Sequence, residues 1–286
     1  MTVSPANSGS IKLDSAPVTA FPSLTSYSVV SNPNLEAIAA PGYMFSGWTG
    51  GVNTAQNPVD VRIDCAIEVQ ANFVPAPYRA YISHITNGYT EWKDFLQVDN
   101  LGGTAAKIQI VLYGSDGSQI YLGEQTTNPF NRSLINLKTL SNNAQSGMVT
   151  FSSDQLLLRL SQENLIGGGI TEFILPETLG TSLGYFFSDF TPSLQYKGLA
   201  LTNFGSQTMT VTLTAFGKGL NLGSTSILLG PNEKVIGTHD VWFPAVDVDD
   251  LQLIQATTSS PNLTGIALTG NQSVQLLVFT PAVLLN

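Results

Sequence analysis

Acidic side chains gather at one place in the sequence, the segment Asp247-Val248-Asp249-Asp250. Alternating aspartates on a loop can ligate Ca²⁺, which takes about six to eight oxygen ligands. The flanks lack the glycine and the distal glutamate of an EF-hand loop. The pattern favours a solvated acidic turn, with Asp247, Asp249 and Asp250 as the candidate calcium ligands. We expect this segment not to bind Ca²⁺ tightly.

Groups for acid–base catalysis are few. The two histidines, His84 and His239, belong to no His-x-His or His-Glu-x-x-His motif. His84 lies in an alternating run that predicts a strand, which favours a structural, hydrogen-bonded histidine. Glu91 and Asp94 flank Trp92, and Glu172 stands alone, so neither arrangement is a clear carboxylate pair for glycoside hydrolysis. We expect no catalytic residue, no cofactor and no enzymatic activity.

A run of three glycines, Gly167-Gly168-Gly169, lacks the following Lys-Ser/Thr of a phosphate-binding loop. It indicates a flexible hairpin connection.

Tryptophan side chains could stack on sugars. Trp242 lies in a loop-like segment and is the best candidate for an exposed stacking residue, but packing in the core or between lobes is the favoured interpretation for it.

The elements that would hold these residues are short strands. Only 11% of the 286 residues are charged, against about 25% in typical proteins, and 43% are hydrophobic. Apolar residues alternate along several runs and are bounded by Gly, Asn, Asp and Pro, as in antiparallel sheets. The clearest break is Val74-Pro75-Ala76-Pro77, a stiff connector that predicts a domain boundary.

The part after this connector contains an internal repeat. Asn100-Leu101-Gly102 matches Asn203-Phe204-Gly205 at an offset of 103 residues (203 − 100), and alternating residues follow at the same offset. Further on, the segment ending at Pro176 matches the segment ending at Pro281. Copies of this size suit β-sandwich lobes. The fold class expected is therefore all-β, with domains at residues 1–75, 78–182 and 183–286, the last two being antiparallel β-sandwich lobes.

The net charge limits the classes of binding partner, and the cysteine count limits the possible disulfides. The net charge is −9 with 11 Lys plus Arg, so nucleic acid and anionic membrane surfaces are poor partners. The single cysteine, Cys65, excludes a disulfide within the chain. Its apolar neighbours predict a mostly buried, unreactive thiol.

The N-terminus lacks the features of a signal peptide. We expect the sequence to begin after a removed export signal, and a cytosolic protein is the alternative.

The N-terminal part carries a strong motif. It runs Pro41-Gly42-Tyr43-Met44-Phe45-Ser46-Gly47-Trp48-Thr49-Gly50, continues with Asn57-Pro58-Val59 and closes with Val69-Gln70-Ala71-Asn72-Phe73. Residues 8–74 resemble the divergent internalin-type B-repeat, also called the bacterial repeat domain. The resemblance implies a small β-grasp-like fold in a bacterial surface or secreted protein. The segment around Cys65 departs from the family, which usually carries a short polar turn there.

Residues 78–286 resemble a duplicated β-sandwich of secreted bacterial proteins. The resemblance rests on Tyr81-Ile82-Ser83-His84-Ile85, on Trp92 and on Leu96-Gln97-Val98-Asp99-Asn100. It implies fold and location but no chemistry.

We therefore expect a non-catalytic, extracellular structural or adhesive module, a component of a stalk or filament. Its partners would be other surface proteins or further copies that associate through strand edges. A carbohydrate-binding module of a secreted protein is the alternative.

Overall fold

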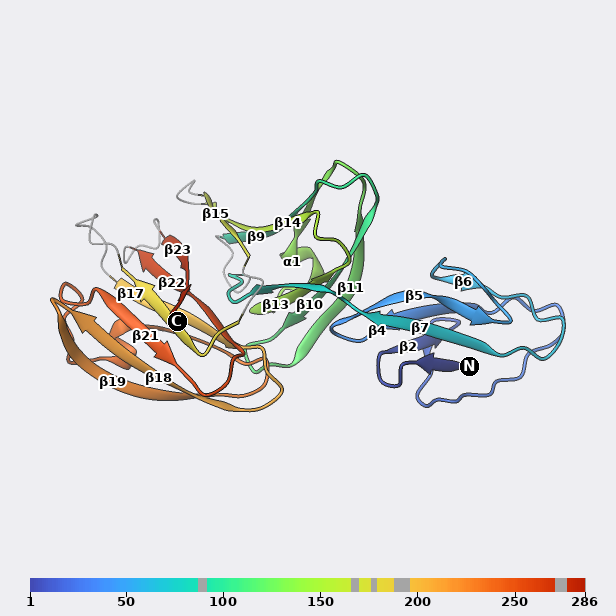
Figure 1. Cartoon of the computed structure of the whole chain (residues 1–286), viewed down its shortest axis with the longest axis horizontal. Coiled ribbons are helices and arrows are strands. Elements are labelled where there is room, and N and C mark those ends of the chain that lie inside the picture. Colours follow the sequence, from blue (N-terminus) through green and yellow to red (C-terminus); the bar gives the residue numbers. More distant parts are fainter. Residues whose placement is uncertain (87–91, 166–169, 176–178, 188–195, 271–276, 286) are drawn as a thin grey trace. The chain divides into compact units, whose positions relative to one another are not determined.

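The computed structural model describes residues 1–86, 92–165, 170–175, 179–187, 196–270 and 277–285 (Figure 1). This part of the chain consists of short β-strands and two single helical turns, α1 (Leu137–Leu140) and α2 (His239–Trp242). Neither turn is long and apolar enough to cross a membrane. The predicted all-β class is confirmed, with several antiparallel sheets.

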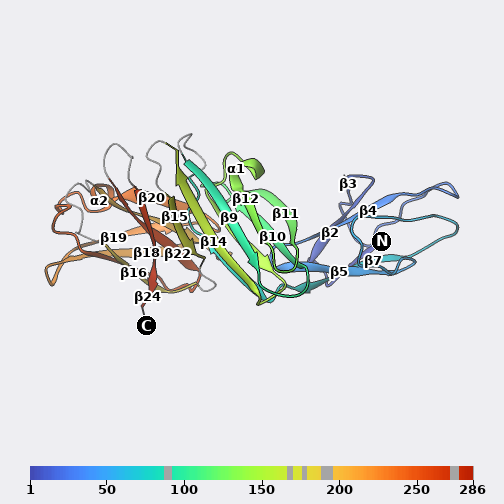
Figure 2. The ribbon, with the colours of Figure 1, turned by 90° about the horizontal axis from the view of Figure 1, so that it is seen from above.

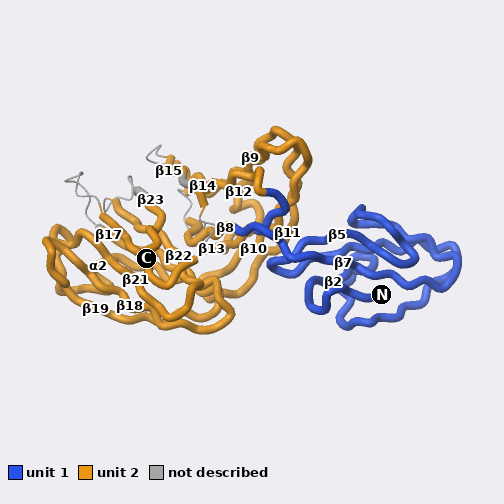
Figure 3. The backbone as a smooth tube through the Cα atoms, viewed as in Figure 1, with its two compact units in different colours: residues 1–79, 150–153 blue, residues 80–149, 154–286 orange. Residues whose placement is uncertain are grey.

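The chain divides into two compact units (Figure 3). Unit 1 holds residues 1–79 together with 150–153, and unit 2 holds residues 80–149 together with 154–286. The predicted three domains stay a prediction. Below, unit 1 and unit 2 are described separately.

Unit 1 contains two small sheets. The first has the order β1-β7-β5 and the second the order β3-β2-β4-β6. Their strands are β1 (Thr2–Ser4), β2 (Gly9–Leu13), β3 (Ala16–Pro17), β4 (Asn34–Ala39), β5 (Tyr43–Gly50), β6 (Val59–Asp60) and β7 (Val69–Pro75). In β4 every second side chain is buried, as expected for a strand with one face on a core.

Aromatic rings fill the core of unit 1. Trp48 is only 2% exposed, and its ring centroid lies 5.3 Å from that of Phe45. Phe45 in turn contacts Phe73 edge-on at 5.7 Å. Gly47, with φ +146°, lies at a register shift in β5 between Phe45 and Trp48. The glycine of the motif therefore supplies a backbone conformation that other residues rarely adopt, and Phe45 and Trp48 both reach the core.

The Asn-Pro of the motif also has a structural task. The Asn57 side chain accepts a hydrogen bond from the Ala37 N–H (2.8 Å) and donates one to the Ala37 carbonyl (2.7 Å). It thereby satisfies both backbone groups of one residue in β4, as a neighbouring strand would.

Unit 2 contains two lobes, each made of two sheets (Figures 1 and 2). We call strands β8 to β15 the first lobe and strands β16 to β24 the second lobe. The first lobe comprises β8 (Tyr78–Ile82), β9 (Trp92–Asn100), β10 (Ala106–Tyr113), β11 (Gln119–Thr127), β12 (Arg132–Asn136), β13 (Ser146–Phe151), β14 (Leu156–Asn164) and β15 (Ile170–Ile174). Strands β8 and β13 each include residues of both units.

The second lobe follows the same plan. It comprises β16 (Ser182–Phe186), β17 (Tyr196–Asn203), β18 (Met209–Gly217), β19 (Leu220–Leu229), β20 (Lys234–Thr238), β21 (Leu253–Thr257), β22 (Leu263–Gly270), β23 (Leu277–Pro281) and β24 (Val283–Leu284). The sheet orders β11-β10-β13-β8 and β12-β9-β14-β15 correspond strand for strand to β19-β18-β21-β16 and β20-β17-β22-β23. Each lobe also has its helical turn between the same two strands. Pro176, which the sequence aligns with Pro281, lies outside the described residues.

Candidate functional site

The two lobes of unit 2 meet through apolar and polar side chains. Trp92 of the first lobe packs on Ala200, Ile266 and Leu268, which lie on the face of sheet β20-β17-β22-β23 opposite its own core. Phe204 of the second lobe contacts two tyrosine rings of the first. Its centroid lies 5.0 Å from that of Tyr81 and 6.2 Å from that of Tyr113. These contacts supply the apolar part of the interface between the lobes.

Lys234 extends from β20 of the second lobe into the first lobe. Its Nζ donates to the carbonyl and the side-chain oxygen of Gln145, at 3.0 and 3.2 Å, and lies 3.5 Å from the Ile85 carbonyl. The backbone N–H of Lys234 also donates to the Ser115 carbonyl (3.1 Å). Lys234 is 6% exposed, and burial lowers its pKa to about 7, although the charge of Asp94 acts to raise it. The ammonium group finds three oxygen acceptors, which matches its three donors.

Asp94 is the acidic member of this interior and is fully buried. One carboxylate oxygen accepts from the backbone N–H and hydroxyl of Thr86 (3.1 and 2.5 Å), and the other accepts from the Gln162 amide (2.6 Å). Burial raises the pKa of Asp94, against the hydrogen bonds from Gln162 and Thr86 and the charge of Lys234. Three donors and a nearby cation offset the desolvation of the carboxylate. Through these hydrogen bonds Asp94 links its own strand to the segments that carry Thr86 and Gln162.

His84 belongs to the same interior, where the charge of Lys234 acts on it. The structural, hydrogen-bonded role expected for it stays a prediction. His84 is buried, and burial followed by the charge of Lys234 holds its pKa well below the usual value. The adjacent Ser83 carbonyl accepts a hydrogen bond from the Thr202 hydroxyl of the second lobe (2.9 Å). We call Ser83, His84, Asp94, Gln145, Thr202 and Lys234 the polar joint.

The polar joint combines perturbed pKa values with the burial of Asp94, His84 and Lys234. Shifted titratable groups occur at active sites, but also in structural ion-pair networks. Here Asp94 and Lys234 are 0% and 6% exposed and are saturated by protein groups. Their arrangement is therefore suited to fixing the two lobes against each other, because breaking it would leave buried charges without partners.

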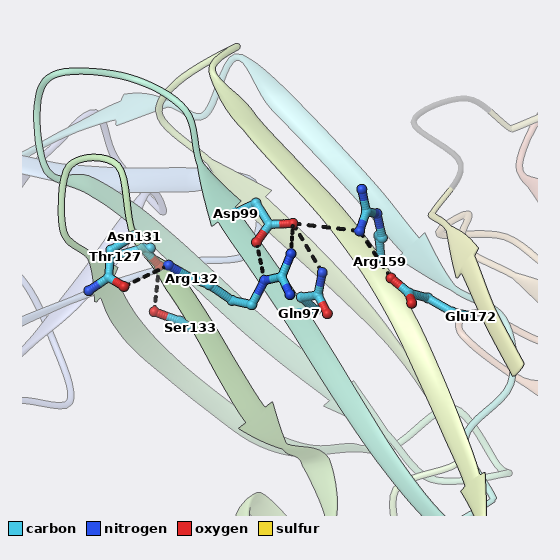
Figure 4. Close-up of polar contacts among 8 residues, drawn as sticks. All are labelled: Gln97, Asp99, Thr127, Asn131, Arg132, Ser133, Arg159 and Glu172. Atoms are coloured by element: carbon cyan, nitrogen blue, oxygen red, sulfur yellow. Dashed lines mark hydrogen bonds and ion pairs between the residues drawn. The ribbon is translucent and has the colours of Figure 1, made fainter. Parts of the chain in front are cut away.

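A second polar cluster lies on the exposed face of sheet β12-β9-β14-β15 (Figure 4). Arg132 donates to both oxygens of Asp99 (2.5 and 3.3 Å), Gln97 donates to one of them (3.0 Å), and Arg159 lies 3.8 Å away. Arg159 also binds Glu172 at 3.1 Å. The hydrogen bond from Arg132 is the main cause that lowers the pKa of Asp99. Both carboxylates therefore neutralise arginines on adjacent strands, and the lowered pKa of Asp99 is the opposite of what a general acid needs.

The neighbouring hairpin end in Figure 4 is held by short polar contacts. The Thr127 hydroxyl donates to that of Ser133 (3.0 Å), and the Asn131 side chain accepts from the Arg132 N–H (2.8 Å). These bonds position the start of β12 and so the arginine that it carries.

Trp242 lies at the end of α2 and is half-buried. Its ring packs on the second-lobe core and covers Gly237, where an added Cβ would come within 2.9 Å of the indole. The ring is therefore used for packing on the second-lobe core. The glycine opposite the ring gives it the space to lie flat on β20.

The three candidate calcium ligands lie close together in the sequence, but the side-chain oxygens of Asp247 and Asp250 have other partners. The Asp247 side chain accepts from the Asp249 N–H (2.9 Å), and Asp250 forms an ion pair with Lys218. Within the described residues no group of three or more His, Cys, Asp and Glu side chains could hold a metal ion.

The prediction for Cys65 is wrong, because the thiol is exposed. Its segment is an irregular connection between β6 and β7, and Ile63 and Ile67 turn toward the unit 1 core while the residues between them face outward. The apolar neighbours would place Cys65 in the core only if the segment were a regular strand, because alternation then fixes the face on which each side chain lies.

A further sequence motif is not among the predicted sites. Gly180-Thr181-Ser182-Leu183-Gly184 matches the Gly-x-Ser-x-Gly pattern of a nucleophile elbow. That elbow requires a turn from a strand into a helix. Ser182 instead begins β16, and its hydroxyl accepts a hydrogen bond from Gln255 (3.3 Å). The structural context of a nucleophile is therefore missing.

Glu91 and the glycine run 167–169 lie outside the described residues. Asp94 and Trp92, which we considered beside Glu91, both point into the joint between the lobes. No protein-family model matches the chain, and no curated protein is similar to it in sequence.

Proposed function

We propose that this chain is a non-catalytic structural and adhesive module of a bacterial surface or secreted protein. The observation that carries the proposal is the polar joint. Lys234 and Thr202 of the second lobe donate to backbone carbonyls of the first lobe, and apolar side chains of both lobes pack in the same interface. A buried interface of this kind joins the two lobes into one body, which suits a stalk or display segment.

The matching strand orders of the two lobes support the same proposal. We infer that they arose by duplication, since they share sheet order, helical turn and the Asn-x-Gly turn. Repeating a sandwich lengthens a module without adding a reactive site. The B-repeat resemblance of unit 1 supports a location outside the cell.

The alternative, a carbohydrate-binding module, would need exposed aromatic rings in a flat row. Trp242, its best candidate, lies half-buried against Gly237. The structural role is therefore the better supported of the two.

Surface labelling tests the proposal. Antibodies against the purified chain should bind intact cells of the source bacterium, or its culture medium, before any permeabilisation. Signal that is present only after lysis would contradict a surface or secreted role. A glycan array provides the second arm, on which we expect no specific ligand. A glycan that binds the native protein and is lost in Trp242→Ala would favour the carbohydrate-binding alternative.

A further inference from the structure

Strand β19 forms one edge of the five-stranded sheet β19-β18-β21-β16-β24 (Figure 1). It spans ten residues, Leu220–Leu229, and within the described residues it pairs with no strand other than β18. One row of its backbone N–H and C=O groups is therefore open. Such an edge is a ready template for another strand.

Proteins usually protect long edges with charges, prolines or short strands. Four other edge strands of unit 2 show these devices: Glu124 in β11, Arg132 in β12, Glu172 in β15 and Pro281 in β23. The fifth strand of the β19 sheet, β24, has only two residues. Strand β19 has neither a charge nor a proline, and it carries the exposed side chains of Leu220 and Leu228. Its register shift against β18 lies at residues 221–223, so residues 224–229 form a regular edge.

The rest of this sheet is equally free of charge. Its five strands contain no Asp, Glu, Lys, Arg or His, although the chain has a net charge of −9. Toward the outer face, Thr212 meets Ser226 and Thr214 meets Ser224, with hydroxyl oxygens 3.2 and 3.0 Å apart. Two copies could approach along this edge without bringing like charges opposite each other.

We propose that β19 pairs in antiparallel fashion with β19 of a second copy of this chain. The register that we favour places Ser226 opposite Ser226, so that Thr225 meets Ile227 and Ser224 meets Leu228. Thr225 and Ile227 point toward the sandwich core yet stay half-exposed at the open edge, and this pairing covers them. The occupant is a second copy because the uncharged sequence is compatible with itself in this register.

The contact is isologous, since the same strand is used by both copies. An isologous contact closes after two subunits. This edge therefore yields a dimer, and a filament would need a different second contact. The inference rests on the proposed structural role and specifies the association through strand edges that the sequence predicts. Its test uses the purified chain, so its result is independent of where the protein is located.

Sedimentation analysis of the full chain tests the pairing. We expect a reversible dimer that strengthens with added salt, because salt screens the repulsion between two negatively charged copies. Ser226→Lys places two like charges face to face and should raise the dissociation constant on the order of tenfold or more. Gln125→Lys is the matched control, because it adds the same charge to the exposed edge strand of the first lobe. It should leave the dimer intact.

A symmetric disulfide tests the register. Ser226→Cys in a Cys65→Ser background should form a covalent dimer when diamide oxidises the two thiols, because directly opposed residues lie within disulfide distance. Asn221→Cys in the same background should not, since its partner in this register lies beyond the strand. A chain that stays monomeric at all concentrations, or a dimer unaffected by Ser226→Lys, overturns the proposal. A monomer that binds an extended foreign peptide along β19 would overturn it too, by assigning the edge to another partner.

Discussion

Asn100 and Asn203 make the same set of hydrogen bonds in the two lobes. Each amide group donates to the carbonyl four residues ahead and to two carbonyls at the end of the edge strand, β11 or β19. Each side-chain oxygen accepts from the N–H two residues ahead. The three acceptor carbonyls are those of Thr104, Thr127 and Asn128 for Asn100 (2.9, 3.0 and 3.1 Å), and of Gln207, Leu229 and Gly230 for Asn203 (2.9, 3.1 and 2.9 Å). The N–H donors are those of Gly102 and Gly205.

This correspondence explains why asparagine occurs at both positions. A side chain with two N–H donors and one acceptor can satisfy a turn and the end of an edge strand together. Aspartate offers no donors, and alanine offers neither group. The same chemistry at the same place in both lobes also supports the proposed duplication.

Replacing Asn203 should destabilise unit 2. Asn203→Ala leaves three carbonyls without their donor, and an unsatisfied buried group costs about 1–3 kcal/mol. We expect the free energy of unfolding, measured by urea denaturation, to fall by at least about 2 kcal/mol. Asn203→Asp keeps the acceptor for Gly205 but loses the donors, so it should be no more stable than the alanine variant. A change within about 0.5 kcal/mol for both would contradict this role.

Gly117 tests the contact between the lobes. It lies in the β10–β11 turn with φ +80°, and an added Cβ would lie 2.1 Å from the Pro231 carbonyl oxygen of the second lobe. Gly219 has nearly the same φ, +78°, but nothing within 4 Å of its added Cβ. Gly219→Ala should lower the free energy of unfolding only by the conformational cost of a positive φ, about 1–2 kcal/mol. Gly117→Ala should lower the stability measured by thermal or urea unfolding by more than this. An equal decrease in the two variants would show that the turn at Gly117 does not need its close contact with Pro231.

Lys234 should make the free energy of unfolding rise with pH above 7. Unfolded lysine keeps its proton up to about pH 10.4, whereas burial lowers the pKa of Lys234 to about 7 in the folded protein. Between these values the unfolded state binds more protons, so the destabilising contribution is complete below pH 7 and is relieved as pH rises. Urea denaturation at intervals between pH 7 and about pH 10 should show this rise in the native protein and a flatter profile in Lys234→Met.

Lys218→Met provides the control for this experiment. Lys218 is exposed, and its hydrogen bond with Asp250 raises its pKa. Its removal should leave the rise linked to Lys234 unchanged. A Lys234→Met variant that keeps the full pH dependence of the native protein would show that this group is not titrating in the joint.

Truncating Trp48 should unfold unit 1 and leave unit 2 folded. The loss of a buried tryptophan costs about 3–5 kcal/mol, which is comparable to the whole stability of so small a unit. In limited proteolysis Trp48→Ala should leave a resistant fragment that starts near Tyr78. Leu24→Ala should behave like the native protein, because Leu24 is 97% exposed. A protected unit 1 in the Trp48 variant, together with loss of a ligand, would make Trp48 a binding residue.

Cys65 should react quickly with a thiol reagent in the native protein. The side chain is exposed on an irregular segment, so no unfolding step is needed to reach it. Mass spectrometry should show one label for each chain within the mixing time in the absence of denaturant. Cys65→Ser should remain unlabelled and keep the native stability. Labelling that occurs only after urea is added would indicate that the thiol is covered.

The sequence alone determined the all-β class, the aromatic core of unit 1 and the two equivalent asparagine turns. These features depend on local rules: alternation along a strand, glycine where the backbone needs unusual angles, and asparagine where a turn needs several donors. Such rules act over a few residues, so the order of residue types carries them directly. The burial of Trp48 followed from its spacing to Phe45 and Phe73 for the same reason.

Only the tertiary structure decided where the charged and reactive groups lie. Lys234 and Asp94 are 140 residues apart (234 − 94) in the sequence, and no local pattern indicates that they share one buried interior. Cys65 is exposed because its segment leaves the regular strand, and β19 is an edge because, among the described residues, it pairs with β18 alone. Burial and pairing are set by contacts between distant segments. Those contacts depend on how whole sheets pack, which the types of neighbouring residues do not specify.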